Sequence, residues 1–256
     1  MAEIAEWARQ RPSGVRLEWG AAGAAALGPE CACVVVVDVL SFTTSVSVAV
    51  EAGTRVLPYP WRDGGAAQFA ARHGAELAVG RRAVSERQPW SLSPAALRSA
   101  PVAERLVLPS PNGSAIAAAV SGVPVVAACL RNAGAVARWI VGQGWGTGRE
   151  PVAVIAAGEQ WPGGVALRPA VEDWLGAGAV AAALARNGAG PLSAEAHAAA
   201  VAYDALADVA ALIRDCASGR ELTEGGFAQD VAVATELDAS AVVPVSTGGA
   251  FVDAAR

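Results

Sequence analysis

The sequence predicts an α/β fold of three layers, α/β/α, around a mostly parallel or mixed sheet. Short apolar runs, the clearest being four valines at 34–37, alternate along the chain with segments of helical pattern. Such runs are typical of strands buried on both faces of a sheet, and their alternation with helices is typical of layered α/β domains. Hydrophobic residues make up 54% of the 256 residues, which provides material for a large core.

The expected elements are bounded by glycine, proline and capping residues. Gly53 ends the first helix, Pro169 stands where a later helix begins, and Ser193 caps the next one. Residues 142–149 are expected to form a surface loop, so that residues 1–256 form a single domain. The expected strands cover residues 34–37, 54–57, 76–79, 105–108, 123–129, 152–156 and 241–245. The expected helices cover residues 43–53, 66–73, 115–121, 132–141, 169–187, 193–217 and 225–236, with a short one after Pro94.

Composition argues against several classes of function. The net charge is −5 and no basic stripe is visible, so we expect no nucleic-acid partner. The N-terminal residues lack a signal-peptide pattern, and proline and glycine interrupt the apolar residues 106–130. We therefore expect a cytoplasmic protein that does not associate with membranes. The cysteines lack C-x-x-C spacing and are expected to be buried free thiols: Cys31, Cys33, Cys129 and Cys216.

Polar residues follow four of the expected strands. In layered α/β sheets, ligands bind beyond the carboxyl ends of the strands, so these residues are candidates for a ligand site. The groups are Asp38-Ser41-Thr43, Ser110-Asn112-Ser114, Cys129-Asn132 and Gly158-Glu159.

Asp38 directly follows the four valines and allows two interpretations. A buried carboxylate is costly unless it is paired or bound to a cation, which favours a magnesium ligand or a phosphoryl acceptor. Alternatively, Asp38 caps the helix that follows. Haloacid dehalogenase phosphatases also have a strand that ends in Asp, but they need a second Asp where this chain has Leu40.

Three further motifs are ambiguous. Residues 111–114 form either a cradle for an anion at a helix N-terminus or an ordinary turn from strand to helix. Glu172 and Asp173 are either a metal-binding pair or acidic residues that stabilise the first turn of a helix. Residues 176–181 fit a loose dinucleotide fingerprint, but they lie inside an expected helix, so close helix packing is the better interpretation.

Several blocks occur in an order and spacing that resemble the 2-phosphosulfolactate phosphatase family, over about residues 33 to 245. Each block is weak alone, and the ordered set is more specific. The blocks are residues 34–40 with Thr43-Thr44, Ser110-Pro111-Asn112-Gly113-Ser114, Asn132-Ala133, Ala157-Gly158, Glu172-Asp173, Ala177-Gly178, Gly219-Arg220-Glu221-Leu222, Asp230 and Val243-Pro244.

The resemblance implies an α/β/α fold, a requirement for Mg²⁺ and hydrolysis of a phosphate monoester. The family's namesake substrate is 2-phospho-3-sulfolactate, on the route to coenzyme M, and its products are 3-sulfolactate and phosphate. The implied partner is a small-molecule phosphate ester, and a homodimer is compatible with this picture. The implied catalytic residues and magnesium ligands are Asp38, Glu172 and Asp173. The implied substrate-binding residues are Ser41, Thr43, Arg82, Ser110, Asn112, Gly113, Ser114, Asn132 and Asp230.

Three blocks depart from the family's pattern. The family usually has Arg where this chain has Ser41, which removes a bidentate contact for an anion that Arg81 or Arg82 could replace. A Gly-Glu-Arg block is here residues 80–82, and a Gly-Asn-Ser-Pro block is here residues 91–94. Two alternatives to the phosphatase stay open. One is a non-catalytic relative that binds a phosphorylated metabolite or a partner protein, and the other is a phosphoryl transferase that uses the same site.

Overall fold

The computed structural model describes residues 4–60, 64–161, 163 and 166–255. Its strands are β1 (Val15–Trp19), β2 (Cys33–Val37), β3 (Arg55–Tyr59), β4 (Glu76–Leu77), β5 (Arg105–Pro109), β6 (Val125–Ala128), β7 (Val152–Ala156), β8 (Glu159–Gln160), β9 (Leu167–Arg168), β10 (Pro244–Thr247) and β11 (Ala250–Asp253). Its α-helices are α1 (Gly20–Leu27), α2 (Phe42–Glu51), α3 (Gly65–His73), α4 (Pro94–Ser99), α5 (Gly113–Ala119), α6 (Ala133–Gly142), α7 (Val171–Arg186), α8 (Ala194–Asp204), α9 (Val209–Asp215), α10 (Ala217–Glu224) and α11 (Ala228–Ala234). Three short 3-10 helices are η1 (Glu6–Arg9), η2 (Gly28–Glu30) and η3 (Arg81–Ala83).

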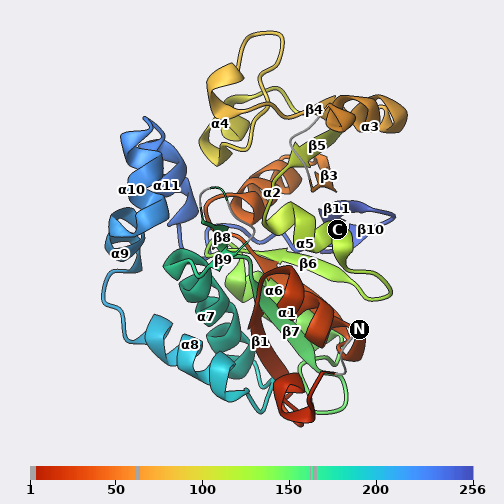
Figure 1. Cartoon of the computed structure of the whole chain (residues 1–256), viewed down its shortest axis with the longest axis vertical. Helices are drawn as coiled ribbons and strands as arrows, with labels where there is room; N and C mark the ends of the chain where they lie inside the picture. The colour runs from red at the N-terminus through yellow and green to blue at the C-terminus, as the bar shows by residue number, and fades with distance from the viewer. Residues whose placement is uncertain (1–3, 61–63, 162, 164–165, 256) are drawn as a thin grey trace.

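One mixed sheet runs through the molecule in the order β1-β7-β2-β6-β10-β11-β3-β5-β4, while β8 and β9 pair with each other (Figure 1). Strands β1, β7, β2 and β6 are parallel neighbours, and so are β3, β5 and β4. The antiparallel pair of β10 and β11 joins these two parallel groups. The predicted α/β fold is thus confirmed, and the single domain over residues 1–256 stays a prediction.

The valines of β2 show how the sheet separates two layers of helices. Val35 and Val37 pack in one core cluster with residues of α6, α7 and α8. Val34 and Val36 pack in another cluster with residues of α1, α2 and α5. All four side chains are fully buried, as expected where successive residues of a strand point to opposite covered faces. Each such burial contributes roughly 1.5–3 kcal/mol, so this strand anchors the residues that follow it.

The glycines of α7 serve close packing, as the sequence indicates. A Cβ atom at Gly178 would overlap the carbonyl oxygen of Ala199 in α8. A Cβ atom at Gly176 would lie 2.6 Å from Cγ2 of Val39. Both are too close for ordinary contact, so glycine at these positions lets α7 approach α8 on one side and the end of β2 on the other.

The first strand and helix, β1 and α1, are not predicted from the sequence. Arg16 and Glu18 interrupt the apolar residues of β1, and α1 is almost entirely alanine and glycine. Yet Arg16 is only 3% exposed and lies 3.5 Å from the carboxylate of Glu30. The partner of this buried charge comes from η2, and a pattern along the strand cannot reveal it.

The helix predicted over residues 193–217 is wrong in its extent. Helix α8 ends at Asp204 and α9 begins at Val209, with an angle of 103° between them. Asp208 causes the restart, because its carboxylate accepts a hydrogen bond from the amide of Ala211 and caps α9. Ser193 caps α8 as predicted. The helix predicted over residues 225–236 is shortened to α11, with the separate helix α10 before it.

The strand predicted at 241–245 is instead the first half of a hairpin. Strand β10 begins at Pro244, and the chain returns as β11 after Gly248 and Gly249. Both glycines have positive φ values, 60° and 82°, which glycine adopts without a steric cost. A two-residue Gly-Gly loop between strands is a hairpin signal, and it accounts for the second strand that the prediction at 241–245 lacks.

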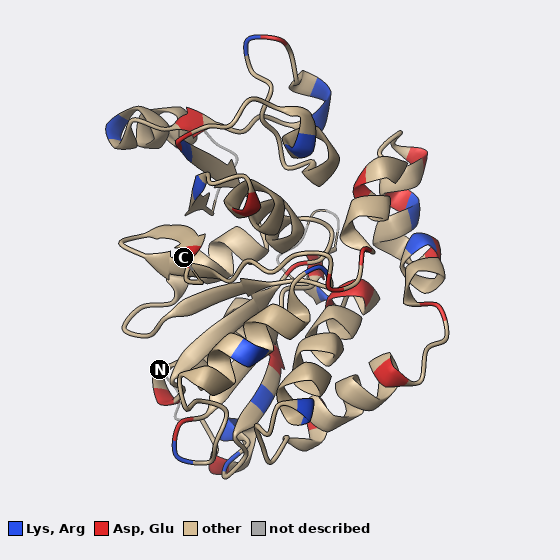
Figure 2. Cartoon of the chain, turned by 180° about the vertical axis from the view of Figure 1, so that it is seen from behind, with Lys and Arg blue, Asp and Glu red and all other residues tan. Residues whose placement is uncertain are grey.

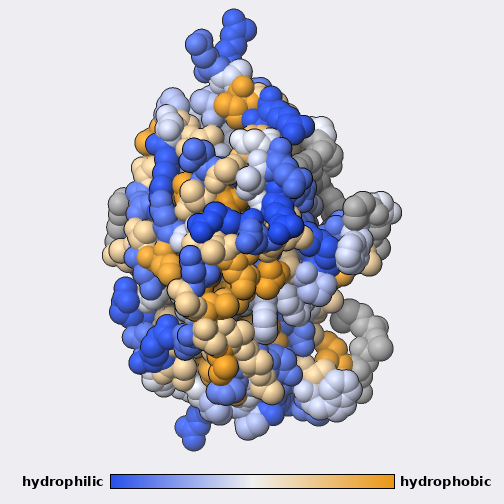
Figure 3. Space-filling model, turned by 90° about the vertical axis from the view of Figure 1, so that its left-hand side faces the viewer, coloured by the Kyte–Doolittle hydropathy of each residue, from blue (hydrophilic) through white to orange (hydrophobic). Residues whose placement is uncertain are grey.

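Charged residues occur on many of the helices and loops around the sheet, and several acidic ones lie near the centre of the molecule (Figure 2). Figure 2 shows acidic residues (red) near the centre of the view, including the N-terminal end of α7. Figure 3 shows hydrophobic residues in small groups among hydrophilic ones on the side that it presents. All four cysteines are buried free thiols, as predicted. Within the described ranges no single helix is long and apolar enough to cross a membrane, although α8 and α9 together, bent, pass the same test of length and composition.

Candidate active site

A cavity of about 210 Å³ lies at the carboxyl ends of β2, β5 and β7. Three of the four polar groups predicted from the strand ends contribute to it, and the group at Cys129 and Asn132 does not. This agrees with the rule that ligands bind beyond the carboxyl ends of the strands. The lining residues are Asp38, Leu40 and Ser41 after β2, Ser110, Pro111 and Asn112 after β5, Glu159 after β7, Arg81 and Leu92, and Ser218, Glu221 and Leu222 of α10.

Asp38 reaches the cavity from the end of β2 and is only 5% exposed. Its Oδ1 accepts a hydrogen bond from the amide of Phe42 at 3.0 Å, and its Oδ2 accepts one from the amide of Gly113 at 2.8 Å. Burial raises the pKa of Asp38, and these two hydrogen bonds oppose the shift. Asp38 therefore caps the start of α2, as one interpretation expects, while its place on the cavity lining leaves the role of metal ligand or phosphoryl acceptor a prediction.

The turn at residues 111–114 brings α5 against Asp38. The amide of Gly113, which was a candidate donor for a bound anion, donates instead to the chain's own carboxylate. A Cβ atom on Gly113 would lie 2.6 Å from Cδ1 of Phe42 and 2.7 Å from Oδ2 of Asp38. Glycine at this position is therefore required for the short contact between β2 and α5.

We expect Gly113→Ala to lower the free energy of unfolding by about 1–3 kcal/mol, because the added methyl group must displace Phe42 or Asp38. Urea unfolding measures this loss. Gly142→Ala is the matched control, since its Cβ atom would meet nothing within 4 Å at the end of α6. Equal stability of the two variants would contradict the tight contact at Gly113.

Glu159 lines the same cavity as Asp38 and is held by Asn112. The side-chain amide of Asn112 donates to Oε2 of Glu159 at 2.8 Å. The pKa of Glu159 is raised to about 7, first by burial and then by the negative charge of Asp38, while Asn112 and Arg168 oppose the shift. The strand rule makes Glu159 a candidate for the ligand site, whereas the site residues implied by the family resemblance do not include it. A carboxylate that titrates near neutrality in a cavity is a candidate for binding a cation or exchanging a proton.

Glu172 and Asp173 are not among the residues that line the cavity. They are 2% and 3% exposed, so they do more than stabilise the first turn of a surface helix. Asp173 accepts hydrogen bonds from the amides of Val39 at 2.7 Å and Gly158 at 2.8 Å, and so ties the ends of β2 and β7 together. Burial and the charges of Asp38 and Glu172 raise the pKa of Asp173 well above its usual value.

Glu172 accepts a hydrogen bond from the thiol of Cys216 at 3.3 Å. Burial, with Glu172 second, raises the pKa of that thiol to about 12, so the thiol keeps the proton that it donates. The contact ties the first turn of α7 to the start of α10, the helix that supplies one side of the cavity.

Arg81 brings a positive charge to the cavity. Its Nε donates to Oδ2 of Asp230 at 2.7 Å, and its Nη2 donates to Oγ of Ser41 at 2.7 Å. The guanidinium carbon also lies 5.6 Å from the centre of the Phe227 ring. Asp230 is 1% exposed and accepts further hydrogen bonds from Ser93 and from the amide of Ala95. Asp230 therefore positions Arg81.

The three departures from the family's pattern meet at this guanidinium. Ser41, which stands where the family has Arg, accepts its hydrogen bond. Ser93, from the departed block at residues 91–94, donates to the Asp230 that holds Arg81. Arg81 itself belongs to the departed block at residues 80–82, and it lies beside Ser41, where the family usually has arginine. Arg82 is exposed and does not line the 210 Å³ cavity, so between these two arginines the structure places Arg81 there.

Three other predicted site residues form hydrogen bonds with the backbone. Thr43 bonds the amide and the carbonyl of Asp38 through its hydroxyl group, and Ser114 donates to the carbonyl of Leu108. Asn132 is completely buried, where its side chain contacts Cys129, Ala127 and Val242. These side chains hold the strand ends in place, and they do not line the cavity.

The positions of the carboxylates determine whether they could hold a magnesium ion. Within the described part of the chain, no three His, Cys, Asp or Glu side chains gather in a way that could hold a metal ion. Magnesium, however, is usually bound through only one or two carboxylates, with waters and substrate phosphates as its other ligands. Asp38 and Glu159 both line the cavity. Burial, and after it the charge of Asp38, raises the pKa of Glu159, so a bound cation would relieve the cost of both charges. Their oxygen donors fit magnesium.

Comparison with known proteins decides the family. A profile of the family described as 2-phosphosulpholactate phosphatase matches residues 25–249, nearly the whole chain. The chain belongs to this family. The members of this family are phosphoric monoester hydrolases, and the family is in general metal-dependent. No curated protein matches the chain. The resemblance seen in the ordered sequence blocks is thereby confirmed.

Proposed function

We propose that this 2-phosphosulpholactate phosphatase relative hydrolyses a small anionic phosphate monoester in the 210 Å³ cavity, with Mg²⁺ as its cofactor. The observation that carries the proposal is that groups of opposite charge line the same cavity, namely the carboxylates of Asp38 and Glu159 and the guanidinium of Arg81. Carboxylates suit a divalent cation, and arginine suits the oxygens of a phosphate. The family's own substrate, 2-phosphosulfolactate, is a small anionic phosphate ester of the kind that such a site would hold.

Each polar side chain has a role in this scheme. Asp38 and Glu159 would hold the magnesium ion, which neutralises phosphate charge and activates water when it is bound. Arg81 binds a phosphate oxygen, and Asn112 fixes the orientation of Glu159. Asp173 holds the two strand ends together, and Glu172 secures α10. Compared with the set inferred from the family blocks, Glu159 replaces Glu172 and Asp173 beside the metal.

The first experiment measures phosphate release from a panel of monoesters, including phosphosulfolactate and phospholactate, with Mg²⁺ and with EDTA. We expect turnover that needs Mg²⁺ and stops in EDTA. Turnover that is equal in EDTA would contradict the metal requirement. If the folded protein binds a phosphate ester but releases no phosphate, it is a binding protein. Transfer of phosphate to an added alcohol would instead identify a phosphoryl transferase.

We expect Arg81→Lys to lower kcat/KM about 10- to 100-fold, because a lysine ammonium group cannot bond Asp230, Ser41 and a phosphate in the same planar arrangement. Arg82→Lys should have a clearly smaller effect, since Arg82 is exposed and does not line the 210 Å³ cavity. Steady-state kinetics on one ester compare the two. A larger loss in Arg82→Lys would return the phosphate-binding role to Arg82, as the sequence suggested.

A further inference from the structure

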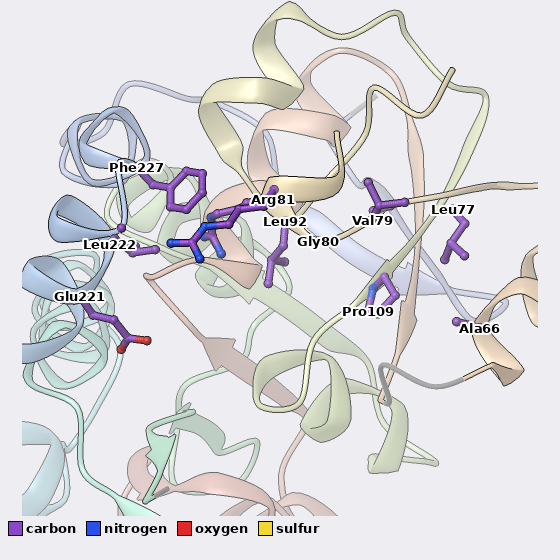
Figure 4. Close-up of a pocket in the computed structure, with 13 residues that line it drawn as sticks. Ala66, Leu77, Val79, Gly80, Arg81, Leu92, Pro109, Glu221, Leu222 and Phe227 are labelled. Carbon is purple, nitrogen blue, oxygen red and sulfur yellow. The ribbon is translucent and has the colours of Figure 1, made fainter. Parts of the chain in front are cut away.

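A second cavity, of about 610 Å³, adjoins the candidate active site (Figure 4). Arg81, Leu92, Glu221 and Leu222 line both cavities, so the two meet at these side chains. Pockets that enclose drug-sized ligands have volumes of roughly 300–1,000 Å³. The larger cavity falls in this range and the smaller one falls below it. A phosphate bound beside Arg81 would therefore have room for a sizeable organic group on its far side.

The larger cavity has a charged end and an apolar end. Arg81, Arg82 and Glu221 supply its charged side chains, and eight of its thirteen lining residues are Ala, Val, Leu, Pro or Phe. Figure 4 shows the apolar end on the side away from Glu221 and Phe227, formed by Ala66, Leu77, Val79 and Pro109.

Phe227 and Asp230 hold the side chain of Arg81 at the boundary between the two cavities. The Phe227 ring packs on one side of the guanidinium group, and Asp230 and Ser41 accept two of its hydrogen bonds. The guanidinium group is therefore held in one position. A phosphate bound to it would lie either on the side of Asp38 or on the side of the apolar end. Only one of these two directions, the one toward Asp38, leads to the candidate catalytic carboxylates.

We propose that the substrate carries an apolar alkyl or aryl extension, which lies in the larger cavity along Leu77 and Val79 while the phosphate lies beside Arg81 and Asp38. A three-carbon organic acid held in the smaller cavity would leave this apolar wall against water. An extension that covers the wall removes apolar surface from water, and each methylene buried in this way tightens binding about fourfold.

The test is a binding series that needs no turnover, because this assignment rests on the phosphatase function proposed above. Methyl-, propyl-, hexyl- and phenylphosphonate resist hydrolysis, and their dissociation constants for the whole chain with Mg²⁺ can be measured by calorimetry. We expect affinity to rise up to about 16-fold from methyl- to propylphosphonate and up to about 60-fold from propyl- to hexylphosphonate, and phenylphosphonate to bind more tightly than methylphosphonate. Affinity that is flat or falls along the series would overturn the proposal.

Two variants locate the extension. Leu77→Gln places an amide on the apolar wall at a partly buried position, and we expect it to reduce the ratio of hexyl- to methylphosphonate affinity about tenfold. Leu212→Gln makes the same change at a partly buried leucine of α9 outside both cavities, and it should keep the ratio of the unmodified protein. A rising series that Leu77→Gln leaves unchanged would place the alkyl group elsewhere and contradict the proposal.

Hydrolysis of the matching phosphate esters separates this proposal from the phosphatase itself. A steep phosphonate series without phosphate release would support the apolar subsite and contradict only the proposed reaction. Phosphate release from several esters with a flat phosphonate series would support the reaction and contradict only the apolar subsite.

Discussion

Asp38→Asn is expected to lower kcat on the order of 10³-fold while the protein stays folded. Asp38 directly follows the fully buried strand β2 and lines the cavity, and an amide removes the charge that would attract the cation. Phosphate release at saturating Mg²⁺ gives the rate, and urea unfolding gives the stability.

Two opposing effects keep the stability of Asp38→Asn close to that of the unmodified protein. The raised pKa of Asp38 means that its charge is costly in the folded state, and asparagine removes that cost. Asparagine also places an NH₂ group against one of the two amides, Phe42 or Gly113, and so loses a hydrogen bond worth about 1 kcal/mol. Asp208→Asn, which preserves a helix-capping oxygen far from the cavity, is the control and should keep full activity. Retention of more than a tenth of the rate in Asp38→Asn would exclude Asp38 as a catalytic carboxylate.

The sheet could be predicted wherever strands are buried on both faces. Uniform apolar runs identified β2, β5, β6 and β7, because no polar residue interrupts a strand that helices cover on both sides. Strand β1 escaped detection because Arg16 is buried against Glu30 of η2. The break between α8 and α9 escaped because no proline or glycine marks it, and Asp208 was the only local signal.

The sequence predicts which strand ends form the site, but it does not predict which individual side chains line it. Asp38, Ser41, Ser110 and Asn112 line the cavity as the strand rule implies. Sequence order could not separate Arg81 from Arg82, because the choice depends on Asp230, which lies 149 residues away along the chain. Sequence order also could not show that both carboxylate oxygens of Asp173 accept hydrogen bonds from backbone amides. These bonds can be inferred only when β2 and β7 are known to lie side by side.

Glu159→Gln is expected to make the metal-free protein more stable at pH 8 than the unmodified protein, and to change its stability much less at pH 5. The folded state raises the pKa of Glu159 from 4.5 to about 7, so between these pH values the folded protein binds a proton that the unfolded chain has lost. Stability is therefore lost as pH rises through this window. The difference between the two pH values should be on the order of 2 kcal/mol in favour of glutamine, because part of the loss already occurs at pH 5.

Urea unfolding in EDTA at both pH values measures this difference, and Glu236→Gln provides a control of opposite sign. Arg98 comes first among the groups that lower the pKa of Glu236, and Arg131 adds to the effect. The stability that Glu236 contributes is present above pH 4.5 and is lost as pH falls through its lower folded pKa, so glutamine there should destabilise the protein at pH 8. If Glu159→Gln behaves like Glu236→Gln, the charge of Glu159 is compensated in the folded state and the cavity has no excess of negative charge.

Magnesium should offset the free-energy cost of a charged Glu159 in the folded protein. The pH dependence of stability therefore also tests the proposed cofactor. A cation between Asp38 and Glu159 stabilises both carboxylates in their charged forms, so Mg²⁺ should raise the unfolding free energy of the unmodified protein more at pH 8 than at pH 5. Glu159→Gln should lose most of this gain, while Glu236→Gln should keep it. Equal stabilisation of both variants by Mg²⁺ would place the metal away from Glu159. Because this readout is stability rather than turnover, it tests the proposed cation site even before the substrate is known.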